Sequence, residues 1–325
     1  MKIAVVGATG LVGREVVKIL LDNNVVEKDD LTLYASKSSA GMLVLFEKHE
    51  FEILELNKRT IKKFDYVFFC AGKNVALEYA QTFINKGAVV IDNSSAFRRS
   101  KNVPLIVPEI NLQLAVGAKL IANPNCSTIG VSLPLYYLSK QHSIKRVVVS
   151  TYQAVSGAGQ KGIEDLQNGT NKKFAYQIAN NLIPQIDSLL ANGYTFEEDK
   201  MSFELKKILQ NRFLKVCATC VRVPILNCHS ESINIEFENE PNIRDLRKIL
   251  SGAQGVCMCD NLKNNIYPMP SEANGKDEVF VGRIRKDISN KRAINMFICF
   301  DNIRKGAALN AVQIVQGLER LKGKK

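Results

Sequence analysis

Short apolar runs alternate with amphipathic segments over roughly the first 125 residues. Residues 2–6 read as a buried strand, and the segment after them has apolar positions at helical spacing, among them Val16 and Leu20. Similar apolar strands recur at residues 31–35, 66–71, 89–92 and 120–122, with a helical segment at 75–86. Strands that alternate with helices predict an α/β domain with a parallel, doubly wound sheet.

The pattern changes in the second half of the chain. Residues 232–238 alternate strictly, with Ile233, Ile235 and Phe237 on one face and polar side chains on the other. A strand with one wet face is typical of antiparallel or mixed sheets. Further strands are predicted at 144–152, 216–223, 278–284 and 293–300, and helices at 159–169, 199–210 and 243–250. We therefore predict a second, α+β domain with a mixed sheet, and we expect the helical segment 307–321 to pack back on the first domain.

Composition narrows the class of protein. The 325 residues are 46% hydrophobic and 23% charged, which is ordinary for a globular chain of two domains. No apolar run approaches the ~18 residues that span a bilayer, and the apolar run at the N-terminus is too short for a signal peptide. We expect a cytoplasmic protein whose eight cysteines are thiols. The formal charge of +12 suits nucleic acid, but it equally suits anionic substrates and a phosphorylated cofactor.

Three glycines, Gly7, Gly10 and Gly13, lie between the first predicted strand and the first predicted helix. This setting places backbone N–H groups and a helix N-terminus against a pyrophosphate, although the spacing differs from the usual G-x-G-x-x-G. A tight turn in any α/β protein is the alternative, but the position in the first strand–helix unit favours a dinucleotide. Residues 33–39, at the end of the second strand, contain no acid to hold the ribose hydroxyls of NAD. Hydroxyls and one lysine there favour NADP.

Cys126 follows the last apolar strand of the first half and begins an apolar segment. A cysteine at the start of a helix has its thiolate favoured by the helix dipole, and the carboxyl edge of a parallel sheet is where such folds bind ligands. Most of the other cysteines fit the role of small buried apolar residues. Cys217 and Cys220 are three apart on a predicted strand and face opposite sides, and no histidine lies near Cys257 and Cys259 in the sequence, so we predict no metal site.

Three histidines are available as partners for a cysteine nucleophile. His49 lies in a charged stretch that we expect to be exposed, and His142 lies at an expected helix end. His229 lies between a strand end and the alternating strand. Taken alone, it fits a structural role better than a catalytic one.

Seven stretches of the chain, taken together in order and spacing, resemble the aspartate-β-semialdehyde dehydrogenase family. They are residues 7–13, 92–98, 123–130 (with Asn-Pro-Asn-Cys-Ser-Thr), 152–159, 222–232, 281–285 and 301–308. The resemblance implies a Rossmann-like NADP-binding domain of residues 1–126 and 303–325, and a catalytic and dimerisation domain of residues 127–302. It further implies reduction of L-aspartyl 4-phosphate by NADPH to aspartate 4-semialdehyde and phosphate, in lysine, threonine and methionine synthesis. The expected partners are these small molecules and further copies of the chain, in a homodimer or a tetramer, with no nucleic acid or membrane.

The same resemblance assigns roles to single residues. Cys126 would be the nucleophile that forms a thioester, and His229 the general acid/base. Gln153 would orient the substrate, Arg222 would pair with its α-carboxylate, and Glu197 would meet its α-ammonium.

Other residues are assigned to the phosphate and the cofactor. The expected phosphate ligands are Arg98, Asn125 and Lys200. The expected NADP contacts are Thr9, Gly10, Leu11, Val12, Gly13, Ser36, Lys37, Ser38, Ser39, Ser156, Gly157 and Asn302.

The chain departs from the family at two positions. Ser38 stands where the family usually has arginine, which removes a guanidinium from the expected 2′-phosphate site. Cys228 stands where the family usually has glycine before the histidine. If that backbone requires a positive φ, a side chain there costs about 1 kcal/mol or more.

Two alternatives stay open at this point. Another phosphate-expelling aldehyde dehydrogenase, such as N-acetyl-γ-glutamyl-phosphate reductase or glyceraldehyde-3-phosphate dehydrogenase, shares the glycine turn, the cysteine and the histidine. A non-catalytic protein that senses NADP or binds nucleic acid is suggested by the charge alone. Residues 123–128 and 222–231 favour the aspartyl enzyme over the first alternative. Against the second, the positive charge is dispersed apart from the C-terminal tail, and the full catalytic set is present.

Overall fold

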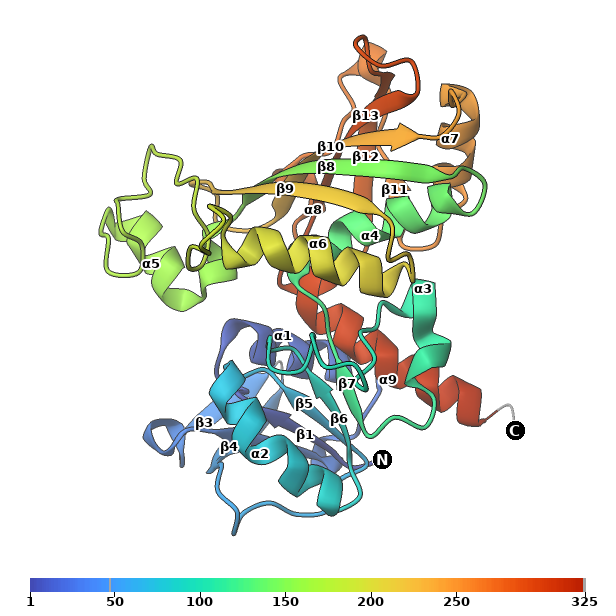
Figure 1. Ribbon diagram of the computed structural model, residues 1–325. Helices are drawn as coiled ribbons and strands as arrows, with labels where there is room; N and C mark the ends of the chain where they lie inside the picture. Colours follow the sequence, from blue (N-terminus) through green and yellow to red (C-terminus); the bar gives the residue numbers. More distant parts are fainter. Residues whose placement is uncertain (47, 324–325) are drawn as a thin grey trace. The chain divides into compact units, whose positions relative to one another are not determined.

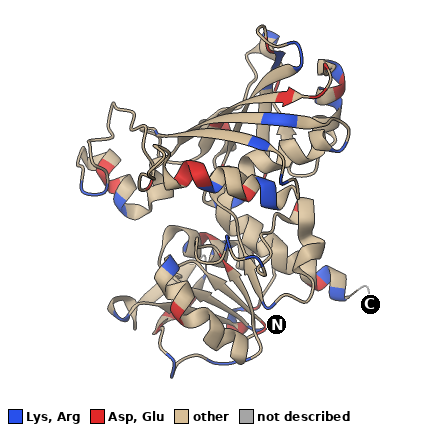
Figure 2. Cartoon of the chain, viewed as in Figure 1, with Lys and Arg blue, Asp and Glu red and all other residues tan. Residues whose placement is uncertain are grey.

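The two predicted kinds of sheet lie in two separate units of the chain, and the computed structural model describes residues 1–46 and 48–323 (Figure 1). One unit comprises Met1–Pro124 and Ala307–Lys325, and the other comprises Asn125–Gly306. Within the described residues, no helix has both the length and the apolarity needed to cross a bilayer. Lys and Arg are interspersed with Asp and Glu in both units (Figure 2).

The first unit is built on a seven-stranded sheet of order β3-β4-β2-β1-β5-β6-β7. All neighbouring pairs are parallel except β3 with β4, which confirms the predicted parallel sheet. The elements are β1 (Ile3–Val6), α1 (Leu11–Asp22), β2 (Leu31–Ala35), β3 (Leu43–Phe46), β4 (His49–Glu55), β5 (Tyr66–Phe69), α2 (Lys73–Asn85), β6 (Val89–Asp92), α3 (Pro108–Asn111), β7 (Leu120–Ala122) and α9 (Leu309–Lys322).

Both faces of this sheet are covered, as its apolar strands require. Ile3 and Val5 of β1 pack in a core with α1 and α9, whereas Ala4 and Val6 pack in a second core with α2. The last helix of the chain therefore returns to the first unit, as its spacing predicted. This arrangement is a Rossmann-like, doubly wound α/β fold.

The second unit is built on a six-stranded mixed sheet of order β11-β12-β13-β10-β8-β9. Its elements are α4 (Cys126–Ser139), β8 (Ile144–Gln153), α5 (Gln160–Asn168), α6 (Phe196–Ile208), β9 (Lys215–Arg222), β10 (His229–Phe237), α7 (Ile243–Ser251), β11 (Val256–Met258), α8 (Pro270–Ala273), β12 (Val279–Lys286) and β13 (Ala293–Phe300). The alternation in β10 is confirmed, because Ile233, Ile235 and Phe237 are buried while Asn234 and Glu236 are half-buried.

Helix α4 is apolar around its whole circumference and buried along most of its length. It packs on α6, α7 and the strands β8, β10, β12 and β13 of its own unit. A helix that is apolar on all sides belongs in a core. Cys126, the first residue of α4, is therefore anchored to the core of the second unit.

Candidate active site

Cys126 is the first residue of α4, and Asn125 before it forms the N-cap. The side-chain oxygen of Asn125 accepts hydrogen bonds from the backbone N–H groups of Ser127 at 3.0 Å and Thr128 at 3.4 Å. Asparagine is favoured at this position because it satisfies N–H groups that have no partner within the helix. The cap fixes the helix start at Cys126, at the positive end of the helix dipole.

His229 faces this cysteine although the two residues are 103 positions apart in the sequence. Its Nε2 lies 3.3 Å from the Cys126 Sγ, and the backbone N–H of Ala154 donates to its Nδ1 at 3.1 Å. Because Nδ1 accepts this bond, the proton of the neutral ring is assigned to Nε2, which points at the sulfur. Burial, together with the charge of Arg222, lowers the pKa of His229 well below its ordinary value. The ring is therefore neutral at pH 7.

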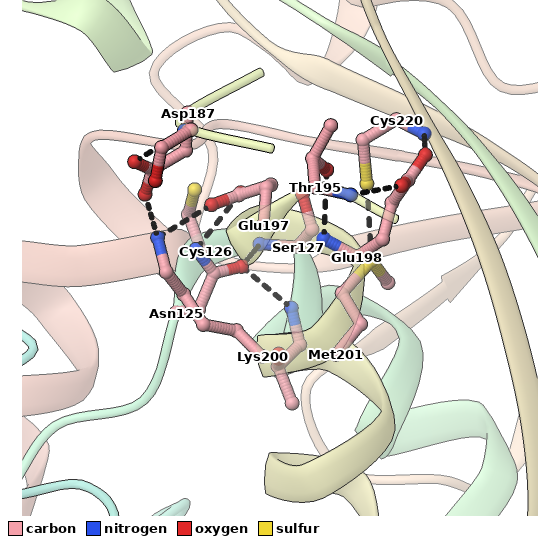
Figure 3. Close-up of polar contacts among 12 residues, drawn as sticks. Asn125, Cys126, Ser127, Asp187, Thr195, Glu197, Glu198, Lys200, Met201 and Cys220 are labelled. Atoms are coloured by element: carbon pink, nitrogen blue, oxygen red, sulfur yellow. Dashed lines mark hydrogen bonds and ion pairs between the residues drawn. The ribbon is translucent and has the colours of Figure 1, made fainter. Parts of the chain in front are cut away.

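Glu197 is the centre of a second group of polar contacts, drawn in Figure 3. It lies in the acidic first turn of α6, which Thr195 and Glu198 close with a capping box. Its Oε1 accepts from the side-chain amides of Asn125 at 2.9 Å and Gln153 at 3.2 Å, and its Oε2 accepts from Lys200 at 2.9 Å. Burial would raise the pKa of Glu197, but Lys200 and the two amides outweigh it and hold the pKa below its usual range. The group is a buried carboxylate at pH 7.

Lys200 is shared between two carboxylates. Its Nζ lies 2.9 Å from Glu197 Oε2 and 2.8 Å from Asp187 Oδ2 (Figure 3). Burial lowers the pKa of Lys200, but the two carboxylates outweigh it and raise the pKa. The ammonium therefore stays charged.

Arg222 ends β9 and is almost fully buried. Its guanidinium donates to the backbone oxygen of Ala154 at 2.6 Å and lies 5.9 Å from the ring centroid of Phe174. Its Nε is buried without a hydrogen-bond partner among residues 1–46 and 48–323. Burial lowers the pKa of Arg222. A buried donor without a partner is costly, so this nitrogen is suited to a bound anion.

Asn302 joins the residue before the histidine to the turn after β8. Its Oδ1 accepts from the backbone N–H of Cys228 at 2.9 Å, and its Nδ2 donates to the Ser156 hydroxyl at 3.0 Å. Cys228 has a φ of +74°, in the region that favours glycine, so its side chain strains the backbone at this position. A Cβ built on Gly157 would stand 3.0 Å from a guanidinium nitrogen of Arg222 and 3.1 Å from Cε1 of His229. The turn at 155–158 thus lies directly against His229 and Arg222.

The glycine turn of the first unit leaves no room for side chains at two of its three glycines. Gly7 has φ of +85°, and a Cβ there would stand 2.8 Å from the backbone nitrogen of Ala71. A Cβ on Gly13 would stand 2.1 Å from the Gly7 oxygen. Gly10 is the N-cap of α1 and has no side chain to occupy the N–H groups of the first helical turn. The N–H groups of this turn, and the lack of room for side chains at Gly7 and Gly13, fit a backbone that a dinucleotide pyrophosphate approaches closely.

The loop after β2 lies beside the glycine turn, because β1 and β2 are parallel neighbours whose carboxyl ends share one edge. Ser36, Lys37 and Ser38 are exposed there, and the hydroxyls of Ser36 and Ser38 lie 2.9 Å apart. Arg98 also belongs to the first unit, where its guanidinium donates to the backbone oxygen of Asn93 at 2.8 Å.

Both halves of the chain match known protein domains. Residues 2–117 match the semialdehyde dehydrogenase NAD binding domain, and residues 135–305 match the semialdehyde dehydrogenase dimerisation domain. The aspartate-semialdehyde dehydrogenase of Aquifex aeolicus is 48% identical over 97% of both chains, and that of Bacillus subtilis is 44% identical over 99% of this chain and 98% of its own. The chain belongs to the aspartate-semialdehyde dehydrogenase family.

Solved structures of the family have the same fold. Aspartate semialdehyde dehydrogenase II from Vibrio cholerae, complexed with ASA, superposes with a TM-score of 0.93 at 36% identity and 98% coverage of both chains. The Candida albicans enzyme with NADP gives 0.76 at 26% identity and the same coverage. The chain is thus an enzyme whose first unit is the family's nicotinamide-binding domain.

Half of the twenty predicted site residues, including those proposed for catalysis and substrate binding, lie in the second unit. The structure brings together Asn125, Cys126, Gln153, Glu197, Lys200, Arg222 and His229, with Ser156, Gly157 and Asn302 beside them. Arg98 and the other predicted cofactor contacts, Thr9 to Gly13 and Ser36 to Ser39, lie in the first unit.

Three contributors to the site were missed. Glu204 accepts from the backbone N–H of Asn125 at 2.6 Å. It lies seven residues after Glu197, so both lie on one face of α6, and this spacing could have identified it from the sequence. Ala154 acts only through its backbone, which no sequence pattern reveals. Asp187 lies in the irregular segment before α6.

Proposed function

We propose that the enzyme reduces L-aspartyl 4-phosphate to L-aspartate 4-semialdehyde and phosphate with NADPH, a step toward lysine, threonine and methionine. The observation that carries this proposal is the Cys126–His229 pair at 3.3 Å, together with the buried cation Arg222 and the buried carboxylate Glu197. A substrate with an α-carboxylate and an α-ammonium group needs both charges. The activity after which the relatives are named, and the ASA bound to the Vibrio cholerae enzyme, support the same substrate.

Cys126 is the nucleophile in this proposal. Its thiolate attacks the acyl carbon, the bond from that carbon to the phosphate oxygen breaks with its electron pair leaving on phosphate, and a thioester remains. A bound NADPH would supply the hydride that reduces this thioester. The resulting thiohemiacetal oxyanion then collapses to the aldehyde and releases the Cys126 thiolate. These steps need no net proton transfer, and the one proton that the overall reaction consumes goes to the departing phosphate.

His229 stabilises negative charge along that route. Its Nε2–H faces the sulfur and is suited to donate to the thiolate and to the neighbouring oxyanion. The family resemblance implied a general acid/base, and the bond from the Ala154 N–H to Nδ1 favours the narrower role of a neutral donor.

Arg222 and Glu197 would hold the amino-acid end of the substrate. The partnerless Nε of Arg222 suits a carboxylate, and the buried carboxylate of Glu197 suits an ammonium group. Gln153 holds Glu197 and orients it. Lys200, Asn125 and Arg98 are the proposed phosphate ligands.

The cofactor in this proposal is NADP, held by residues 9–13 and 36–39 of the first unit and by Ser156, Gly157 and Asn302 of the second. The clash that a Cβ would make at Gly7 and Gly13 supports a close approach of the pyrophosphate. The absence of any acid from residue 33 to 39 supports NADP over NAD.

We also propose a homodimer or tetramer in the cytoplasm. The match of residues 135–305 to a dimerisation domain supports assembly through the second unit. The eight cysteines, all within the described residues, form no disulfide, which suits a reducing compartment.

One assay tests the reaction. The enzyme is incubated with NADP, phosphate and aspartate semialdehyde, and the absorbance band of NADPH is followed. Formation of NADPH that requires both phosphate and this aldehyde supports the proposal. Turnover with glyceraldehyde 3-phosphate or N-acetylglutamate semialdehyde in place of aspartate semialdehyde, or no turnover with any of them, contradicts it.

A further inference from the structure

Lys200, a proposed phosphate ligand, already carries two negative partners. Asp187 and Glu197 lie 2.8 Å and 2.9 Å from its Nζ (Figure 3). One ammonium and two carboxylates sum to a net charge of −1. A dianionic phosphoryl group that approaches this cluster is repelled unless one carboxylate withdraws.

The two carboxylates differ in how firmly they are held. Glu197 lies on α6, its side chain is only 6% exposed, and Asn125 and Gln153 bond it as well. Asp187 lies in the irregular segment between α5 and α6, and its side chain is 41% exposed. Asp187 also has φ of +70°, an unfavourable backbone conformation for most residues. The carboxylate that can leave Lys200 at lower cost is therefore Asp187.

The backbone keeps Asp187 within reach of Lys200. Ile183 pairs with Arg222 through two backbone hydrogen bonds of 2.9 Å and 3.0 Å, and the oxygen of Ser188 accepts from the N–H of Phe196 at 2.8 Å. These anchors lie on both sides of Asp187. The Asp187 carboxylate can move away from the Lys200 ammonium, but the anchored backbone keeps it close enough to return.

We propose that Asp187 is an internal competitor for phosphate, occupying the Lys200 ammonium until the phosphoryl group of the substrate displaces it. The proposal rests on the proposed function, since it takes Lys200 as a phosphate ligand. Its consequence is that phosphate binds more weakly than Lys200 alone would allow, and that the return of Asp187 assists the departure of the phosphate product. Asp187 thus sets the affinity of the site for the leaving group without touching the reacting carbon.

The decisive variant is Asp187→Asn. Asparagine removes the charge at nearly constant shape and tolerates a positive φ, so the loop keeps its conformation. In the oxidation of aspartate semialdehyde, the KM for phosphate should fall by about threefold or more, while the KM for the aldehyde stays within about 1.5-fold. Asp187→Gly, which also suits a positive φ, should shift the KM for phosphate in the same direction.

A matched control is Asp245→Asn, which removes the same charge from an exposed position on α7. It should leave the KM for phosphate unchanged. If both asparagine variants lower that KM equally, the effect comes from net charge and the proposal is wrong.

Lys200→Met separates this inference from the proposed function. If it raises the KM for phosphate and Asp187→Asn does not lower it, Lys200 binds phosphate and the competition is refuted. If Lys200→Met leaves the KM for phosphate unchanged, Lys200 is not a phosphate ligand and both statements about it fall. A fall with Asp187→Asn and a rise with Lys200→Met supports both.

Discussion

His229 gives the sharpest test of the proposed chemistry, because its two ring nitrogens have separate partners. The Ala154 N–H donates to Nδ1, and Nε2 faces Cys126. Asparagine can place an amide oxygen near the Nδ1 position, whereas glutamine can place an amide N–H near the Nε2 position. Comparing His229→Asn with His229→Gln therefore separates the contact of Nδ1 with Ala154 from the contact of Nε2 with Cys126.

The size of the effect follows from one hydrogen bond. A bond to a charged group is worth ~1.5–3 kcal/mol, and its loss slows the step by about 10- to 150-fold. His229→Asn loses the donor to sulfur and should lose activity by that factor. His229→Gln keeps a donor and should retain at least about tenfold more activity than His229→Asn, yet unfold at a lower temperature because the buried Ala154 N–H loses its acceptor.

The assay is kcat for NADPH formation from pH 6 to 8.5, together with thermal unfolding of each variant. Since the pKa of His229 is lowered well below its ordinary value of about 6.5, the wild-type kcat should show no step near that pH. If His229 acts instead by gaining and losing a proton, neither amide can replace it. Equal loss of activity in the two variants, with a wild-type step near pH 6.5, would refute the neutral donor.

Three further substitutions test other parts of the structure. Cys126→Ser should abolish turnover and leave NADP binding intact, because a hydroxyl is a far weaker nucleophile; activity above a few per cent of wild type would exclude this nucleophile. Ser38→Arg should widen the NADP/NAD ratio of kcat/KM by about tenfold or more, since the added bonds reach only a 2′-phosphate, and equal improvement with both cofactors would contradict the predicted role of this loop. Gly13→Ala should lower the Tm strongly, because its Cβ would stand 2.1 Å from the Gly7 oxygen. Gly10→Ala is the control: a Cβ there comes no closer than 3.5 Å to other atoms, so the Tm should be nearly unchanged.

The sequence predicts the strands well where they are buried on both faces. Residues 31–35, 89–92 and 120–122 match β2, β6 and β7, because continuous apolar runs in a parallel sheet leave little choice of boundary. Lys48 and Glu50 are exposed, as expected for the charged stretch around His49, but the histidine itself is not. His49 is half-buried and opens β4, where Phe51 and Ile53 are buried between charged residues. The alternation was present in the sequence, but the charges on the wet face of this strand concealed it.

The proposed nucleophile could be found from local signals, but its partner could not. Cys126 follows a strand and starts a helix, and both features are visible within a few residues. His229 faces Cys126 only because β10 brings the two together across 103 positions, and no periodicity encodes that pairing. The family resemblance supplied what local physics could not, namely which histidine faces which thiol.

The segment between α5 and α6 shows why an irregular stretch can still belong to a site. It has no apolar period, so its sequence predicts neither helix nor strand. Its backbone nevertheless bonds Ile183 to Arg222, the residue proposed to hold the substrate carboxylate, and Ser188 to Phe196 at the start of the helix that carries Glu197 and Lys200. A segment bonded on both sides of Asp187 to β9 and to the start of α6 has this side chain placed by those elements rather than by its own pattern. These bonds place Asp187 at Lys200, and under the proposed roles they connect the residue that would hold the substrate carboxylate with the lysine that would hold phosphate.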